Sequence, residues 1–217
     1  MSNEIRHHLT DAILMAYAAG NLTEAFSLMV ASHVSLCDEC RARLESFDAL
    51  GGALLEEQDD TVPLAEDSLA ATLARITAQD STPQPARPRR PGVLPAPLQD
   101  YVGGDLDRIR WRPVGMGVKQ AILKTGPGAS ARLLFIPAGM AMPDHGHHGT
   151  EMTMVLQGAF SDEHEYFARG DVEIADEDIQ HTPVADISED CICLAVTDAS
   201  LRFTSLLPRL AQPFLRI

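Results

Sequence analysis

Two groups of metal-ligating residue types lie far apart in this chain of 217 residues, and the spacing within each group suits a single ion. The first group is His33, Cys37 and Cys40, with the pair His7 and His8 upstream. His33 and Cys37 are four residues apart and therefore share one face of a helix. Cys40 follows at C-x-x-C spacing, which lets two thiolates close on one ion at a helix start. The group predicts a structural zinc site, for which either His7 or His8 supplies the fourth ligand.

The second group is His145, His147, Glu151 and His181. In an extended strand His145 and His147 point to the same side, and Glu151 follows across a bend. His181 comes thirty residues after Glu151. Three imidazoles and one carboxylate suit zinc, iron, manganese or nickel, and ligand softness does not decide between them.

The chain has only four cysteines, in two close pairs. In a reducing compartment such pairs are more often metal or redox sites than structural disulfides. Oxidation of Cys37 and Cys40 to a disulfide, with loss of the ion, is an alternative for the first group. Cys191 and Cys193 alternate on an expected strand and face one side. They are interpreted as small buried core residues or, alternatively, as an oxidation-sensitive pair beside the second metal.

Apolar residues at helical spacing predict four short helices between residues 9 and 79. The first begins at Thr10-Asp11 and stops at Gly20; the others begin near Thr23-Glu24, after Asp38 and near Leu64. The fourth carries Leu69, Leu73 and Ile76 on one face. We expect the four helices to bury a core of modest size, of the kind that a metal ion often stabilises. The stripe on the fourth helix is either part of this core or a surface that fills a groove of a partner.

The composition changes abruptly at residue 80. Prolines interleaved with arginines predict an extended linker over residues 80–97. Short runs with period two then predict strands at 114–123, 131–136, 150–156, 171–175, 191–197 and 201–206. Many short strands indicate an antiparallel barrel or jelly roll. The predicted fold is therefore a multi-domain α and β protein: a small all-α four-helix domain over 1–79, the linker, and a β-barrel over 98–217.

The charge of the chain narrows its possible partners. The formal net charge is −14, which argues against direct nucleic-acid binding. Up to Gln79 there are four basic and thirteen acidic residues, a balance of −9, which suits docking on a basic partner, although solubility alone also explains it. No apolar run is long enough to span a bilayer, and the N-terminus lacks the regions of a secretory signal, so we expect a cytoplasmic protein.

The first group resembles the zinc-binding anti-sigma domain, whose pattern is a distal histidine followed by H-x-x-x-C-x-x-C on a small four-helix fold. Residue by residue, the match is His8, His33, Cys37 and Cys40. This resemblance favours His8 over His7 as the fourth zinc ligand. It implies binding of a group IV (extracytoplasmic function, ECF) sigma factor, whose polymerase-binding surfaces the domain hides.

The second group matches the first cupin motif from Gly139 to Gly158 through His145, His147 and Glu151, and His181 takes the histidine position of the second motif. This second motif departs from the cupin pattern. Asp176 and Asp178 stand where a Pro-x-Gly turn is common, and Ala185 stands where asparagine is common, so the turn is expected to differ and a substrate-orienting group to be missing.

The combination, which runs nearly end to end, is similar to the ChrR-type zinc-binding anti-sigma factors. The resemblance implies a protein that is not an enzyme. It implies a regulator that sequesters a σE-type ECF sigma factor and releases it when the cupin-like domain senses oxidative stress, as singlet oxygen or organic hydroperoxide. Zinc is expected at the first site and also at the second, where iron, manganese or nickel are alternatives. The rival interpretation is a cupin dioxygenase or isomerase with an N-terminal zinc module.

Overall fold

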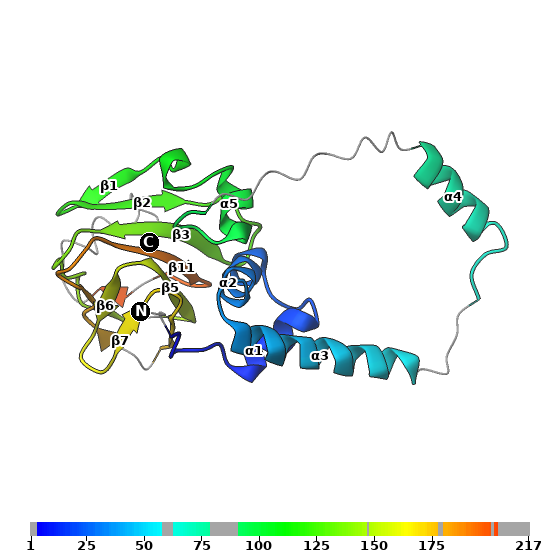
Figure 1. Ribbon diagram of the computed structural model, residues 1–217, viewed down its shortest axis with the longest axis horizontal. Coiled ribbons are helices and arrows are strands. Elements are labelled where there is room, and N and C mark those ends of the chain that lie inside the picture. Colours follow the sequence, from blue (N-terminus) through cyan, green and yellow to red (C-terminus); the bar gives the residue numbers. More distant parts are fainter. Residues whose placement is uncertain are drawn as a thin grey trace.

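The structure, a computed structural model, describes residues 4–57, 63–78, 91–146, 148–177 and 180–200, and the backbone of 202–203. Helices come first along the chain and antiparallel strands follow (Figure 1). The helices are α1 (Asp11–Ala18), α2 (Glu24–Val34), α3 (Asp38–Glu56), α4 (Ser68–Ala78), α5 (Ala96–Val102) and the 3₁₀ turn η1 (Leu106–Arg108). No helix in these ranges combines the length and the apolar composition that crossing a membrane requires.

Three of the four predicted helices begin where their start signals lie, and the fourth, α4, begins at Ser68 instead of near Leu64. The Thr10 side chain accepts a hydrogen bond from the Ile13 N–H (3.3 Å), which caps α1, and Thr23 precedes α2 in an extended conformation. Cys37 is the N-cap of α3, and its sulfur accepts from the Cys40 N–H at 3.4 Å. The C-x-x-C pair therefore lies at the start of a helix, as predicted.

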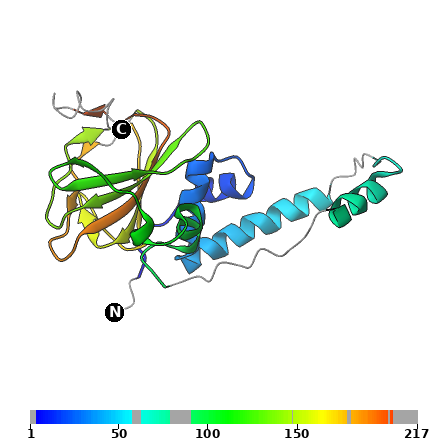
Figure 2. The same ribbon diagram turned by 90° about the horizontal axis from the view of Figure 1, so that it is seen from above.

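Helices α1, α2 and α3 do not enclose a core of their own. Buried residues of α1 and α2, such as Leu14, Met29 and Val30, belong to one apolar cluster together with Leu98 of α5 and the strands beneath them. Helix α2 packs across the sheet, while α3 extends away from the barrel (Figure 2). The helical part is therefore anchored on the β-barrel through a shared core.

Helix α4 differs from the expectation that it completes a four-helix core. None of its residues is buried, and Leu69, Leu73 and Ile76 are 72%, 52% and 59% exposed. In Figure 1, α4 stands apart from the other helices and from the barrel. Within the described residues, the apolar stripe of α4 is thus a surface and not part of a core.

In the described residues, three antiparallel sheets make up the barrel. The largest has the strand order β1 (Arg112–Gly115), β2 (Val118–Ile122), β3 (Ser130–Ile136), β11 (Cys191–Thr197), β5 (Glu151–Gln157) and β8 (Val172–Ala175). The second is β10 (Val184–Ala185), β6 (Ala159–Ser161) and β7 (Tyr166–Ala168). The third is β12 (Arg202–Phe203), β4 (His145–Gly146) and β9 (Gln180–His181).

Most predicted strands lie close to the observed ones, with two kinds of error. The predicted strand at 114–123 is wrong as a single element, because β1 and β2 form a hairpin there. Met116 (φ 50°) and Gly117 (φ 82°) turn the chain between Gly115 and Val118, as two-residue hairpin loops with positive φ do. The short strands β4, β6, β7, β9 and β10 and helix α5 were not predicted. Residues 80–90, which fall in the predicted linker, lie outside the described residues, as do residues 79, 201 and 204–217, and the predicted domain boundaries stay a prediction.

Strand β11 is buried on both faces and joins the two halves of the molecule. Ile192 and Leu194 pack in the cluster shared with the helices, while Cys191 and Cys193 pack in a second cluster inside the barrel. Successive residues of a strand point to opposite faces, which explains this division. Cys191 and Cys193 therefore lie on the face of the large sheet that lines the barrel, and Ile192 and Leu194 lie on the face that packs against the helices.

We expect Gly158→Ala, at the turn between β5 and β6, to lower the free energy of unfolding by about 2 kcal/mol, because left-handed backbone costs a residue with a Cβ about 1–2 kcal/mol. Gly158 has φ 69°, and an added Cβ would lie 2.8 Å from the Asp190 carbonyl oxygen. Urea denaturation would measure the change. Gly51→Ala is the matched control, since its added Cβ would meet no atom of the described residues within 4 Å and α3 should gain about 0.5–1 kcal/mol. Equal stability of the two variants would contradict this account.

Candidate metal centres

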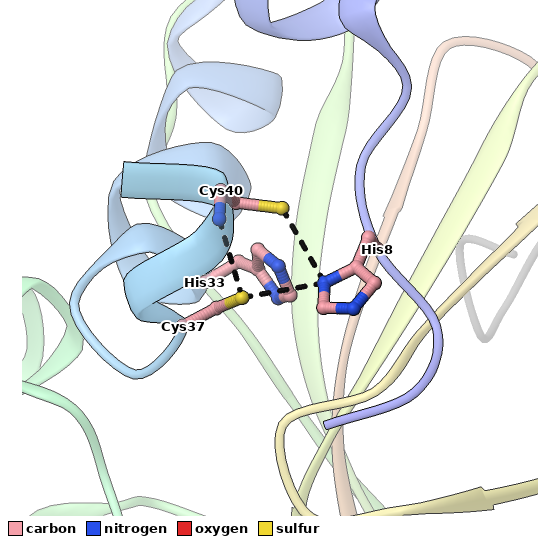
Figure 3. A group of neighbouring side chains, drawn as sticks. All are labelled: His8, His33, Cys37 and Cys40. Carbon is pink, nitrogen blue, oxygen red and sulfur yellow. Dashed lines mark hydrogen bonds between the residues drawn. The ribbon is translucent and has the colours of Figure 1, made fainter. Parts of the chain in front are cut away.

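Four side chains converge at the start of α3 (Figure 3). His8, His33, Cys37 and Cys40 each offer a ligand atom, and these atoms all lie within 4.8 Å of one another. The His8 Nδ1 atom lies 3.3 Å from the Cys37 sulfur and 3.6 Å from the Cys40 sulfur. Ligands bound at about 2.0–2.3 Å to a tetrahedral zinc lie roughly 3.5 Å apart, so these distances fit such an ion. We call these four residues the first cluster.

His33 is held as a neutral metal ligand would be. Its Nδ1 donates to the carbonyl of Gly170 (3.0 Å), while its Nε2 is buried and has no hydrogen-bond partner among the described residues. A buried ring nitrogen without a partner is costly unless another group binds it. Burial lowers the pKa of His33 to about 4, so its imidazole is neutral at pH 7. The ring is therefore oriented by one nitrogen and presents the other to the two thiols, as histidines that bind metals do.

The two adjacent histidines at the N-terminus point to different places. His8 lies in the first cluster, and its Nε2 is 3.4 Å from the Glu39 carboxylate, which follows the helix start. His7 lies toward the barrel, with Nε2 3.1 Å from Glu165 and its ring 4.4 Å from the ring of Phe167. The structure thus places His8 with the thiols and His7 elsewhere, in agreement with what the resemblance favours.

The charge around the thiols suits a thiolate site. Cys37 is 2% exposed and Cys40 is 0% exposed. Burial raises the pKa of the Cys40 thiol to about 11, so a nearby cation is needed to hold it as a thiolate. Arg43 supplies one positive charge, with Nη1 3.8 Å from the Cys40 sulfur. A divalent ion would supply the rest, and the four donors are of the types that zinc accepts.

The second group is only partly brought together by the described residues. His145 on β4 pairs directly with His181 on β9, and their ring centroids are 4.8 Å apart. His145 Nδ1 donates to the Pro143 carbonyl at 2.8 Å, which places the ring lone pair on Nε2. Burial lowers the pKa of His145 to about 4. His147 lies outside the described residues.

Glu151, at the start of β5, is half-buried, and its charge interacts with that of His181. Burial raises the pKa of Glu151 to about 7, and the nearby charge of Glu173 adds to this effect, while His181 and Arg132 oppose it. Its carboxylate lies 3.3 Å from the Thr153 hydroxyl. The side chain is thus electrostatically coupled to His181, and its part in binding a metal stays a prediction.

Two carboxylates that the sequence analysis did not single out lie against His181. Its Nδ1 is 2.9 Å from Glu173 and 3.6 Å from Asp162, and the three residues form a group whose ligand atoms lie within 4.8 Å of one another. Burial lowers the pKa of His181, but the contact and charge of Glu173 outweigh burial and raise it. A carboxylate against one ring nitrogen orients the other toward a metal. We call His145, Glu151, Asp162, Glu173 and His181 the second cluster.

A sequence signal existed for Glu173 but not for Asp162. Glu173 is a charged residue within a short strand whose other members are Val172, Ile174 and Ala175, and a carboxylate in such a place is rarely buried unless it is paired with another group. Asp162 follows β6 in a turn, where aspartate is common for local reasons. Only the fold brings it to His181.

Cys191 and Cys193 lie on the same side of β11, as the alternation predicted, with sulfurs 3.4 Å apart. Both are buried in the cluster inside the barrel. The Cys191 contact, followed by burial and the charges of Glu173 and Glu151, raises the pKa of Cys193. The pair is therefore packed as core residues that also border the second cluster.

These observations define a class of protein: a helical module that can hold a metal ion through two histidines and two cysteines, built onto an antiparallel β-barrel with a second cluster of histidines and carboxylates. Residues 99–200 match the family model described as the ChrR cupin-like domain. The chain is 61% identical over 213 residues to the anti-sigma-E factor ChrR of Cereibacter sphaeroides, covering 98% of this chain and 99% of the relative. This chain belongs to the ChrR family of anti-sigma factors.

A solved structure supports the same conclusion. The crystal structure of Rhodobacter sphaeroides SigE in complex with the anti-sigma ChrR matches with a TM-score of 0.78 and 58% identity, over 89% of this chain and 99% of that chain. The predicted combination of a helical metal-binding part with a cupin-like barrel is therefore confirmed, and so is the resemblance on which it was based. The family is one of regulators, which excludes the interpretation of the chain as a cupin dioxygenase or isomerase.

Proposed function

We propose that this protein sequesters an ECF sigma factor of the σE type. The observation that carries the proposal is the set of apolar side chains left exposed at the end of α3, at Leu64 before α4, and on α4. Its members are Leu50, Leu54, Leu55, Leu64, Leu69, Leu73 and Ile76, each more than half exposed. Large apolar side chains exposed in such numbers mark a binding site for another protein. The relative of similar sequence is named an anti-sigma-E factor, and the similar solved structure is a complex with SigE.

The charge of the helical part fits the same partner. Residues 1–79 carry a net charge of −9, which speeds association with a basic surface and disfavours binding to nucleic acid. Helices α3 and α4 present the apolar side chains, and a groove of the sigma factor would receive them as helix-in-groove interfaces do.

We assign a different proposed role to each of the two metal sites. His8, His33, Cys37 and Cys40 would hold a structural zinc ion, which ties the N-terminal segment to the junction of α2 and α3 and so fixes the direction in which α3 leaves the barrel. His145, His147, Glu151 and His181 would hold a second ion in the barrel, zinc in the first instance, with iron, manganese or nickel as alternatives. There Glu173 orients His181, and the Pro143 carbonyl orients His145.

We also propose that the barrel reads oxidative stress, as singlet oxygen or organic hydroperoxide, and that this event releases the sigma factor. The support is the burial of a metal-type cluster and of two cysteines next to each other inside the barrel. Because a sigma factor acts on RNA polymerase, this function places the protein in the cytoplasm.

The proposal is tested by co-expressing the tagged full chain with each ECF sigma factor of its source organism. We expect one of them to co-purify as a stable complex on size exclusion, with bound zinc, and to lose transcription activity with RNA polymerase in vitro. A primary sigma factor is the control and should not be retained. Failure of the zinc-loaded chain to retain any ECF sigma factor would refute the proposal.

A further inference from the structure

The turn Gly170–Asp171 of the barrel is bonded directly to the first cluster. The Gly170 carbonyl accepts from Nδ1 of the ligand His33 (3.0 Å). One carboxylate oxygen of Asp171 accepts from the backbone N–H groups of Arg6 (2.6 Å) and His7 (2.9 Å), the two residues before His8. Two of the four side chains of the first cluster are thus positioned by adjacent residues of the barrel.

The next two residues continue to the second cluster. The Val172 N–H donates to the His7 carbonyl (3.2 Å), so the N-terminal segment lies along the start of β8. One residue further, the Glu173 carboxylate lies 2.9 Å from His181 Nδ1. We call residues 170–173 the coupling segment, because each of the four bonds either the first cluster, its flanking backbone or the second cluster.

The coupling segment has little freedom to adjust. Asp171 is 2% exposed, and its second oxygen accepts from the Ala168 N–H at 2.8 Å, which closes the turn. Gly170 has φ 92°, and a Cβ there would lie 2.6 Å from the Ile5 side chain, so the N-terminal segment packs directly on this turn. Packed, fully bonded segments transmit small displacements instead of absorbing them.

A solvent-accessible pocket borders both clusters. A pocket of about 540 Å³ lies between the N-terminal segment and the barrel. Its lining includes His8 of the first cluster and Asp162 and Glu173 of the second. The two clusters are therefore separated by one short stretch of chain and one water-accessible space.

We propose that residues 170–173 couple the two clusters, with Asp171 as the positioning residue, so that a change at Glu173 and His181 alters how tightly His8, His33, Cys37 and Cys40 hold their ion. This inference rests on the proposed function of the first cluster as a metal site. It gives the barrel a physical route to the helices that carry the apolar surface.

The test uses the full-length, metal-stripped protein and Co²⁺ in competition with a chelator. The thiolate-to-cobalt charge-transfer absorption reports the site that contains Cys37 and Cys40. We expect Asp171→Asn to weaken Co²⁺ binding there about 10-fold, in the range known for groups that orient metal ligands. Glu173→Gln should change the Co²⁺ affinity of the first cluster about 3-fold, which corresponds to a coupling free energy of about 0.7 kcal/mol. In the double variant that carries both substitutions, Glu173→Gln should not change the Co²⁺ affinity any further, because Asp171→Asn has already disrupted the contacts that connect the two clusters.

Asp105→Asn is the matched control. The Asp105 carboxylate also accepts from two successive backbone N–H groups, those of Val93 and Leu94, both at 2.9 Å, but it contacts neither cluster in the described residues. The Co²⁺ affinity of the Asp105→Asn protein should stay within about twofold of that of the wild type.

Three results would overturn the inference. In the first, Asp171→Asn and Glu173→Gln both bind Co²⁺ as the wild type does, which leaves the proposed function standing. In the second, Asp105→Asn weakens binding as much as Asp171→Asn, which reduces Asp171 to a general structural role. In the third, the wild type shows no charge-transfer absorption, and the metal site of the proposed function fails together with the coupling.

Discussion

Replacing Cys40 with alanine is expected to remove the ion from the first cluster and to weaken sigma-factor binding at least about 100-fold, because loss of a ligand exceeds the loss caused by outer-shell changes. The Cys40 sulfur is fully buried and lies 3.6 Å from His8 Nδ1, so neither water nor another side chain of the described residues can take its place at the same point. In small metal-bound domains the free energy of metal binding is also free energy of folding. The start of α3 should therefore lose its fixed position.

The measurement is zinc content per chain, together with the dissociation constant of the sigma-factor complex. Cys193→Ala is the control, because Cys193 is equally buried but lies on β11 inside the barrel. The control should keep the zinc of the first cluster and its sigma-factor affinity. A Cys40→Ala protein that lost its zinc but kept full affinity for the sigma factor would contradict the proposal that the metal ion fixes the position of α3 for binding.

Replacing Leu69, Leu73 and Ile76 together with serine is expected to weaken the sigma-factor complex roughly 100- to 10,000-fold, since buried apolar anchors contribute on the order of 1–2 kcal/mol each to an interface. The three residues lie on one face of α4, and all are more than half exposed in this structure. The free energy of unfolding should change by less than about 0.5 kcal/mol, as for other surface substitutions. Isothermal titration calorimetry and urea denaturation measure the two effects separately.

Exposed apolar residues of the barrel provide the control for this variant. Met116 and Ile187 are 72% and 86% exposed, and Met116→Ser with Ile187→Ser should leave sigma-factor affinity unchanged. If the α4 variant lost more than about 1 kcal/mol of stability, the stripe would belong to a core, as the alternative interpretation of the sequence held. Unchanged sigma-factor affinity would remove α4 from the proposed interface.

Short-range features of this protein were readable from the residues. The spacing of His33, Cys37 and Cys40 predicts their convergence, because helix geometry puts residues four apart on one face and a C-x-x-C pair at a helix start. The starts of α1 and α2 follow from Thr10 and Thr23, and the alternation of β11 places Cys191 and Cys193 on one side. The resemblance added the choice of His8, which spacing alone left open.

Other features depended on contacts between distant parts of the chain. Glu173 and Asp162 meet His181 only when β8, the turn after β6 and β9 are assembled. The exposure of the α4 stripe was not predictable, since a helix of the same pattern packs in a core whenever a partner surface lies nearby. The hairpin at Met116 was missed because its left-handed backbone gives only a weak signal in a sequence with methionine at that point.

The sequence by itself therefore determined the two sets of ligand types, the order of helices before strands and the family. Each of these follows from residue type and local periodicity, which do not require knowledge of the partner surface. Only the tertiary structure decided that α1, α2 and α3 share their core with the sheet and that the turn Gly170–Asp171 bonds the first cluster. Those contacts join residues more than 100 positions apart, and such pairings arise from the packing of whole elements, which no local pattern records.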